Sequence, residues 1–182
     1  MAVLAVLRGP YVTEQFNPHD DIRGGAYRAV LDFARAQGVA DALLVVRDGV
    51  HLDPSGEAVL ARLEPYLRER RKARSWPGTQ LGGRGHNATV TRYRLNKEVV
   101  GILVEAADGL FDWTHLQLPE DLCLLRSSGS PWLTTIAHEY EAWFDLTPAE
   151  SERMRQTIPD LVPPVRSRSD EIARRKRRRK RR

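Results

Sequence analysis

The sequence predicts an α/β (α+β) fold, in which a βαβα first half is joined to an antiparallel meander in one mixed sheet. Three observations support this prediction. Apolar runs alternate with helical spacing up to residue 67, which is typical of strands joined by helical crossovers. Residues 121–146 contain three β-forming runs separated by turn residues, which indicates two consecutive hairpins. A capping box at residues 147–150 predicts a C-terminal helix that ends before Pro159.

Length and composition bound the number of domains. A chain of 182 residues, of which 41% are hydrophobic, can bury one substantial core. We therefore expect a single globular α/β domain over residues 1–162. Residues 163–182 are expected to form a disordered Arg/Lys-rich tail, because nine consecutive cations repel one another and offer no apolar surface.

The first half is expected to begin with two strands and a helix between them. Residues 2–7 and 42–46 are apolar enough for buried strands, and the order of elements favours parallel pairing. Apolar residues recur at helical spacing through residues 22–37. Gly38 suits the position that follows a helix end.

A second helix is expected after the second strand. Asp53 is a suitable N-cap, and Pro54 at the first helical position loses no needed hydrogen bond. Because Pro65 cannot continue the helix, we expect a kink or a break near Glu64.

The middle of the chain is expected to hold a loop and further strands. Residues 75–87 are rich in glycine and turn residues, which indicates a mobile loop. Residues 88–95 and 99–104 favour a tightly connected antiparallel pair of strands, and residues 111–118 favour another strand.

The meander that follows has the clearest strand signals. Residues 122–125 and 132–137 are rich in apolar and β-forming residues, and residues 140–146 alternate with period two, as a half-buried strand does. His138 and Glu139 are expected to form the turn between the last two strands.

Charge is segregated along the chain. Residues 166–182 have a net charge of +9, so the rest of the chain carries −4. Residues 68–97 hold nine basic residues against Glu69 alone, whereas residues 98–165 hold 12 acidic residues against three arginines. The high isoelectric point therefore belongs to the tail.

This segregation favours a non-enzymatic or accessory protein that binds the phosphate backbone of nucleic acid. A polybasic segment gains affinity by releasing counterions, and cations interleaved with aromatic rings suit contacts with phosphates and bases. The tail has two alternative explanations, a solubilising terminus or a segment that docks on the acidic meander of the same chain. For the middle segment the alternative is a basic strand face paired with acidic neighbours. The residues assigned to this interface are Arg70, Arg71, Lys72, Arg74, Trp76, Arg84, Arg92, Arg94, Arg174, Arg175, Lys176, Arg177, Arg178, Arg179, Lys180, Arg181 and Arg182.

An alternative hypothesis is a metal-dependent hydrolase or nuclease. Asp48, His51 and Asp53 follow the second expected strand, and His19 and Asp20 follow the first. If the two strands are parallel neighbours, these side chains meet at the carboxyl end of the sheet, where ligands of open α/β sheets bind. Imidazole and carboxylate groups there can hold a divalent metal that activates water. The favoured hypothesis needs no cofactor.

Residues 48–60, DGVHLDPSGEAVL, resemble the last conserved block of the SGNH or GDSL-type hydrolases. In that block an Asp and a His of a catalytic triad precede a helix, and Asp48 and His51 stand in the matching places. The resemblance covers about a dozen residues. Such enzymes place the nucleophilic serine near the start of the domain, but residues 1–47 contain no serine, so no family is assigned.

A third hypothesis is a protein-binding module, for instance an inhibitor or immunity-like protein. Its acidic C-terminal half, including Glu139, Glu141 and Asp145, would meet a cationic partner.

The remaining signals concern location. Cys123 lies within an apolar run and has no second cysteine to pair with, which indicates a buried structural thiol. Residues 2–7 lack a basic flank and are far shorter than the roughly 20 residues of a membrane span. We therefore expect a cytoplasmic protein without membrane contact.

Overall fold

The fold is built on a seven-stranded sheet. In the computed structural model, the described residues are 14–18, 20–83, 87–159 and 161. The strands of the sheet are β1 Glu14–Phe16, β2 Asp41–Arg47, β3 Leu67–Ala73, β6 Ala88–Arg94, β7 Glu120–Leu125, β8 Pro131–Ile136 and β9 Glu141–Leu146. They lie in the order β1-β9-β8-β7-β2-β6-β3, with every neighbouring pair antiparallel.

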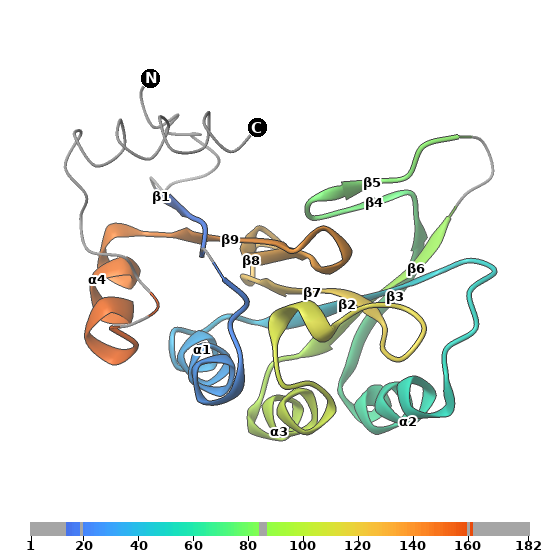
Figure 1. Cartoon of the computed structure of the whole chain (residues 1–182), viewed down its shortest axis with the longest axis horizontal. Helices are drawn as coiled ribbons and strands as arrows, with labels where there is room; N and C mark the ends of the chain where they lie inside the picture. The colour runs from blue at the N-terminus through green and yellow to red at the C-terminus, as the bar shows by residue number, and fades with distance from the viewer. Residues whose placement is uncertain (1–13, 19, 84–86, 160, 162–182) are drawn as a thin grey trace.

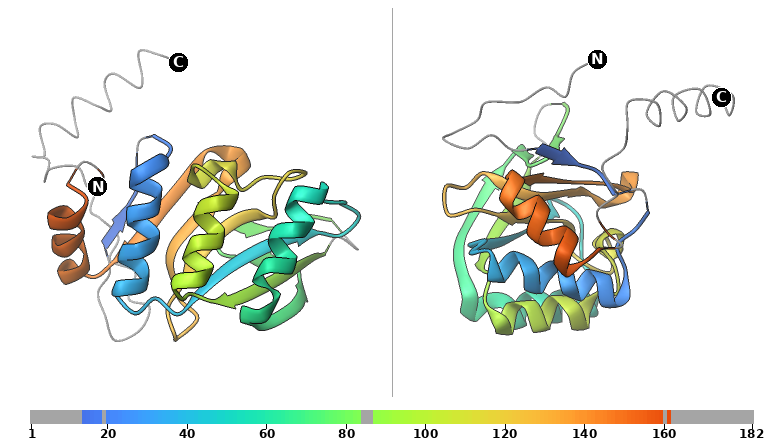
Figure 2. Two further views of the ribbon diagram at one scale, coloured as in Figure 1. Left: turned by 90° about the horizontal axis from the view of Figure 1, so that it is seen from below. Right: turned by 90° about the vertical axis from the view of Figure 1, so that its left-hand side faces the viewer.

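Helices cover one face of this sheet, and a small hairpin lies over the other (Figure 1). The helices are α1 Gly24–Ala36, α2 Pro54–Leu63, α3 Lys97–Ala106 and α4 Pro148–Thr157, and the hairpin is β4 Ser75–Trp76 with β5 Thr79–Gln80. Short 3-10 segments are η1 Glu64–Tyr66, η2 Leu110–Asp112 and η3 Ala137–Glu139. From below, α1, α3 and α2 lie side by side across the sheet, and α4 lies at one end (Figure 2). Nowhere in the described chain is a helix both long and apolar enough to cross a bilayer.

Two hydrophobic clusters, one on each face, hold these layers together. Alternate side chains of β2 show the division, because Ala42 and Leu44 belong to the large cluster under the helices. Leu43 and Val45 belong to a smaller cluster that includes Trp76 of the hairpin. The predicted mixed α/β architecture is confirmed, with the sheet buried on both faces at its centre.

The predicted parallel pairing is wrong for the strands that the structure describes. Residues 2–7 lie outside the described residues, and β2 pairs with β6 and β7, both antiparallel. The pairing directions nevertheless make β2 and β3 parallel to each other, with β6 inserted between them. The unit β2-α2-β3 is thus a split βαβ, whereas the sequence predicted parallel pairing between residues 2–7 and 42–46.

The helices expected in the first half are confirmed. The helix expected over residues 22–37 is α1, and Gly38 after it has a φ of +77°, which glycine adopts without strain. The second helix begins at Pro54 and changes to a 3-10 turn at Glu64, as Pro65 requires.

The strand expected over residues 99–104 is instead helix α3. The Asn96 side chain caps it by accepting a hydrogen bond from the Val99 N–H at 2.9 Å. Its buried side chains recur at helical spacing and pack in the helix-side cluster: Val99, Val100, Ile102 and Leu103. Burial of this apolar face outweighs the weak strand preference of its β-branched residues.

Two other segments also differ from expectation. The loop expected over residues 75–87 contains the β4-β5 hairpin, whose Trp76 is buried, although residues 84–86 lie outside the described residues. The strand expected over residues 111–118 is an irregular connection. It is held by fully buried Trp113, whose indole N–H donates to the Tyr27 hydroxyl at 2.9 Å.

The meander and the last helix are confirmed. Strands β7, β8 and β9 form the two expected hairpins, and His138 and Glu139 lie in the turn between β8 and β9. Cys123 is buried, as expected, and burial raises the pKa of its thiol to about 12. The expected capping box is present, because Thr147 Oγ1 accepts from the Glu150 N–H while Glu150 Oε2 accepts from the Thr147 N–H. The tail expected over residues 163–182 lies outside the described residues.

We expect Thr147→Ala to lower the free energy of unfolding by about 1 kcal/mol, because it leaves the Glu150 N–H without its acceptor. Urea denaturation followed by circular dichroism measures the change. Ser127→Ala, in the exposed turn between β7 and β8, is the matched control and should leave the midpoint unchanged. A Thr147→Ala protein as stable as the control would contradict the role of this cap.

Candidate functional site

Of the predicted metal-binding residues, those that the structure describes are not brought together. β1 and β2 are separated by β9, β8 and β7, which is roughly 19 Å at the usual spacing of strands. Asp20 is exposed near the β1 side, and His19 lies outside the described residues. Among the described residues, no group of three His, Cys, Asp or Glu side chains can hold a metal ion.

The residues after β2 have other partners. Asp48 accepts a hydrogen bond from Lys72 Nζ at the end of β3, and no contact joins it to His51, which is exposed. Asp53 is the N-cap residue of α2, and its backbone N–H donates to the Leu116 carbonyl at 2.9 Å. The Asp–His pair that the hydrolase resemblance requires is therefore not formed in this structure.

The predicted basic interface is largely paired with acidic side chains. On β3, Arg70 is bound to Glu64, Arg71 to Glu69 and Lys72 to Asp48. These pairs are exposed and contribute little stability, so the cations remain accessible. On β6, Arg92 is held between Asp41 and Glu69, and Arg94 is exposed.

The remaining members of that predicted interface are Arg74, Trp76, Arg84 and residues 174–182. Arg74 donates to the Gly83 carbonyl, and Arg84 and residues 174–182 lie outside the described residues. Trp76 is 6% exposed, so its ring is not presented to a nucleic acid base. Trp76 and Arg92, both assigned to that interface, make contacts within the fold, Trp76 with Asp121 and Arg92 with Asp41.

A buried carboxylate organises one end of the sheet. Asp121, at the start of β7, is fully buried, and its Oδ2 accepts from Trp76 Nε1 at 2.8 Å and from Thr79 Oγ1 at 3.3 Å. Its Oδ1 accepts from the Ala137 N–H at 3.0 Å. One side chain thus fastens both the β4-β5 hairpin and the η3 turn to β7.

The neighbouring carboxylate, Glu120, is held by two basic groups. Its Oε1 accepts from Arg47 Nε, and its Oε2 lies 3.1 Å from His115 Nδ1. Burial raises the pKa of Glu120, but the hydrogen bonds from His115 and Arg47 outweigh burial and lower that pKa below its usual value. For Asp121 the effect of burial on the pKa is larger than that of the hydrogen bonds from Trp76 and the Ala137 N–H, so the pKa is raised.

An acidic groove lies between α2 and α3, on the helix side of the sheet. Its volume is about 690 Å³, within the range of ligand pockets. The charged residues that line it are Asp53, Glu105, Asp108, Asp112 and Arg62. Apolar side chains line much of the remaining wall: Ala58, Val59, Ala106, Ala107, Phe111 and Leu118.

Ion pairs neutralise this groove only in part. Arg62 is bound to Glu105, while Arg23 of the α1 N-cap is bound to Asp108 at 3.2 Å and to Asp112 at 2.8 Å. Arg23 is shared further with Asp21, so three carboxylates surround a single guanidinium. The groove therefore keeps an excess of negative charge above apolar walls.

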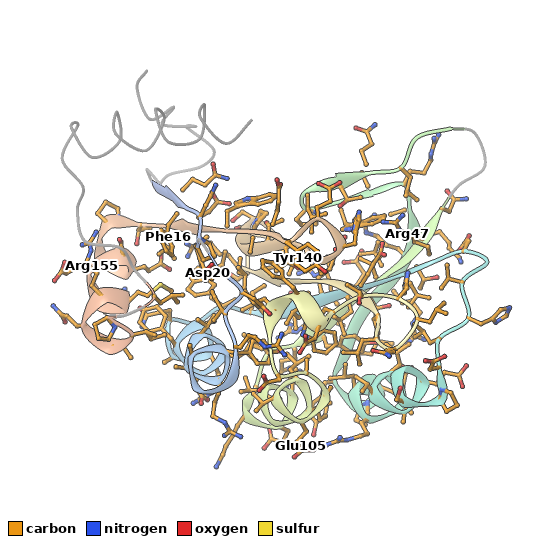
Figure 3. All side chains as sticks on the ribbon, in the orientation of Figure 1. Phe16, Asp20, Arg47, Glu105, Tyr140 and Arg155 are labelled. Carbon is orange, nitrogen blue, oxygen red and sulfur yellow. The ribbon has the colours of Figure 1, made fainter. Side chains whose placement is uncertain are left out.

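An exposed tyrosine adjoins this groove. Tyr140 is 76% exposed and has a φ of +56°, a conformation that is rare for bulky residues. Its ring lies edge-on to Phe111, with 5.8 Å between the ring centroids, and Phe111 lines the groove. Figure 3 shows Tyr140 on the surface above the turn that carries Phe111.

Sequence reasoning missed most of this site. It counted Glu120 and Asp121 only as acidic residues, and it included Tyr140 in the period-two alternation of residues 140–146. Ala142, Phe144 and Leu146 do point inward, but the left-handed conformation of Tyr140 takes its side chain out of that alternation. Adjacent acidic residues directly before the apolar run of β7 were the one available signal for a buried carboxylate.

In comparison with known proteins, no family model, curated protein or solved structure matches the chain.

We expect Asp121→Asn to destabilise the fold by about 2 kcal/mol, because an amide has one acceptor oxygen where the carboxylate has two, so its NH2 group must face either the Trp76 indole N–H or the Ala137 N–H. In a double-mutant cycle the effects of Asp121→Asn and Trp76→Phe should be less than additive, since the second change removes one of the two donors that compete for the remaining oxygen. Urea denaturation measures all three proteins. Asp20→Asn, on the surface, is the control, and full additivity would contradict the contact.

Proposed function

We propose that this chain is a non-enzymatic protein-binding module, which holds a cationic segment of a partner protein in the acidic groove and against Tyr140. The single observation that carries the proposal is the strained, solvent-exposed conformation of Tyr140 beside that groove. A left-handed tyrosine costs on the order of 1–3 kcal/mol and persists only where its surroundings impose it.

The surroundings of Tyr140 fix it firmly. The Ala137 N–H is bound by buried Asp121, and the Tyr140 N–H donates back to the Ala137 carbonyl at 3.1 Å. Such a rigid aromatic ring loses little conformational entropy when a partner covers it, which is why tyrosine is common among the residues that dominate binding energies.

The groove suits a basic side chain with an apolar stem. Arginine and lysine carry a charge at the end of a hydrocarbon chain, so the stem can contact Val59 and Phe111 while the charge reaches Asp108 or Glu105. A partner cation would replace or share the surface pairs made by Arg62 and Arg23, which are weak because they are exposed. The acidic surface would also speed association with a cationic partner.

Reversing the groove charge tests this proposal. Glu105→Lys with Asp108→Lys should weaken binding of a short labelled peptide that alternates Arg with Leu by about tenfold or more, because attraction becomes repulsion. Fluorescence anisotropy measures the affinity, and the same peptide with Gln in place of Arg should bind weakly to the unchanged protein. Asp32→Lys with Glu152→Lys makes the same charge change outside the groove and is the matched control.

Tyr140→Ala should lower the affinity for this Arg/Leu peptide by a similar factor. Leu67, on β3, is also exposed and apolar, and Leu67→Ala should leave the affinity unchanged. Equal binding of the charged and uncharged peptides, or equal effects of the groove and control reversals, would contradict the proposal.

A second candidate function is association with nucleic acid through the cationic tail, helped by β3. The observation that favours it is the placement of Arg70, Arg71 and Lys72 on an edge strand, with half or so of each side chain exposed. Their exposed ion pairs do not prevent phosphate contacts, since a surface pair is worth at most about 1 kcal/mol. Trp76 takes no part in this candidate, because its ring is buried.

Deleting residues 166–182, which carry a net charge of +9, should reduce affinity for single-stranded RNA and DNA at low salt by about a hundredfold or more. It should also flatten the dependence of that affinity on salt concentration, because fewer counterions are released. Electrophoretic mobility shift assays over a range of salt measure both. Unchanged binding after deletion would eliminate this candidate.

A further inference from the structure

A second pocket lies on the hairpin side of the sheet and involves none of the groove residues. Its volume is about 370 Å³, which is enough for a small molecule. The β4-β5 hairpin forms one wall, and the β8 end with the η3 turn forms the other. The side chains relevant here are Arg47, Thr79, Gln80, Ile136, His138 and Glu139.

Arg47, the last residue of β2, is held in place from two directions. Its Nε donates to Glu120, which His115 holds through the other carboxylate oxygen. The guanidinium lies over the Trp76 ring, 5.9 Å from the centroid, and Trp76 is itself fixed by Asp121. Figure 3 shows Arg47, the last residue of β2, below the β4-β5 hairpin.

These contacts do not use the hydrogen-bond donors of the two terminal amino groups of Arg47. Among the described residues, the terminal amino groups of its guanidinium have no hydrogen-bond or ion-pair partner, and the side chain is 33% exposed where it lines the pocket. A planar guanidinium that is fixed through Nε and by stacking presents two parallel N–H groups, the geometry that carboxylates and phosphates match.

We infer that this pocket binds a small molecule through an oxyanion, a carboxylate or a phosphate, which accepts two hydrogen bonds from the terminal amino groups of Arg47. The Gln80 amide and the His138 ring, both on the pocket wall, supply further donors. This site is independent of the proposed partner groove, since it lies on the other face of the sheet and shares no lining residue with it.

The charges around the pocket determine the affinity for the anion and how that affinity depends on salt concentration. Glu120 balances the charge of Arg47, and Glu139 Oε1 on the rim lies 3.8 Å from His138 Nε2. Recognition therefore depends on hydrogen-bond geometry more than on net charge. We expect weak affinity for a bare anion, in the millimolar range, that changes little with salt, unlike binding by counterion release.

Nuclear magnetic resonance of the full chain tests the inference with two probes, inorganic phosphate and acetate. At least one of them should shift the Arg47 Nε–H and Trp76 Nε1–H resonances saturably, while the indole resonance of Trp113 stays in place. The probe that saturates at lower concentration identifies the phosphate or the carboxylate as the preferred group. Chloride at equal ionic strength is the control, and shifts that match those of chloride would overturn the site.

Two variants separate a binding site from a structural contact. Arg47→Gln should weaken binding by about tenfold to a hundredfold, because it removes both charge-assisted hydrogen bonds. Gln80→Glu leaves Arg47 and Glu120 unchanged but adds a negative charge at the wall, so it should weaken binding while preserving stability. Gln156→Glu, on α4, is its matched control. Affinity that survives Gln80→Glu and Arg47→Gln would overturn the inference, and if Arg47→Gln fails to fold, Gln80→Glu against its control still decides it.

Discussion

The structure depends on the buried carboxylate of Asp121. The β4-β5 hairpin and the η3 turn are both short segments, and each is hydrogen-bonded to β7 through this one side chain. Withdrawing a carboxylate from water is costly, and the cost appears as a pKa raised above the usual value. Three hydrogen bonds offset part of it and fix where the hairpin and the turn lie.

Both candidate binding surfaces follow from that constraint. The η3 turn presents Tyr140 on one side and His138 on the other, so the groove surface and the Arg47 pocket each contain part of the same anchored turn. The hairpin supplies Trp76, whose ring contacts the Arg47 guanidinium. A single buried acid therefore gives rigidity to two surfaces on different faces of the sheet, which is the preorganisation that tight recognition requires.

The charged segments that are separate along the sequence form ion pairs with one another in the folded chain. The basic segment of residues 68–97 forms much of β3 and β6, where its cations meet acids from distant parts of the chain, such as Asp41 and Asp48. The acidic half of the chain contributes most of the carboxylates around the α2-α3 groove. Opposite charges that are far apart in sequence are thus paired on one side of the molecule, and an unbalanced acidic surface remains on another.

The sequence by itself determined the elements whose signals are local. Apolar periodicity predicted α1 and α2, turn residues predicted the hairpins of β7, β8 and β9, and the capping box predicted α4. Each of these patterns lies within about a dozen neighbouring residues, so it can be recognised without knowledge of the tertiary structure. It also indicated the buried state of Cys123.

Only the tertiary structure decided which strands are neighbours and which side chains meet. The insertion of β6 between β2 and β3 separates strands that run in the same direction, and α3 is a helix because its apolar face is buried against the sheet. The meeting of Asp121 with Trp76, and of Arg47 with Glu120, joins residues 45 and 73 positions apart. Such contacts depend on packing across the whole chain, and no local spacing encodes them.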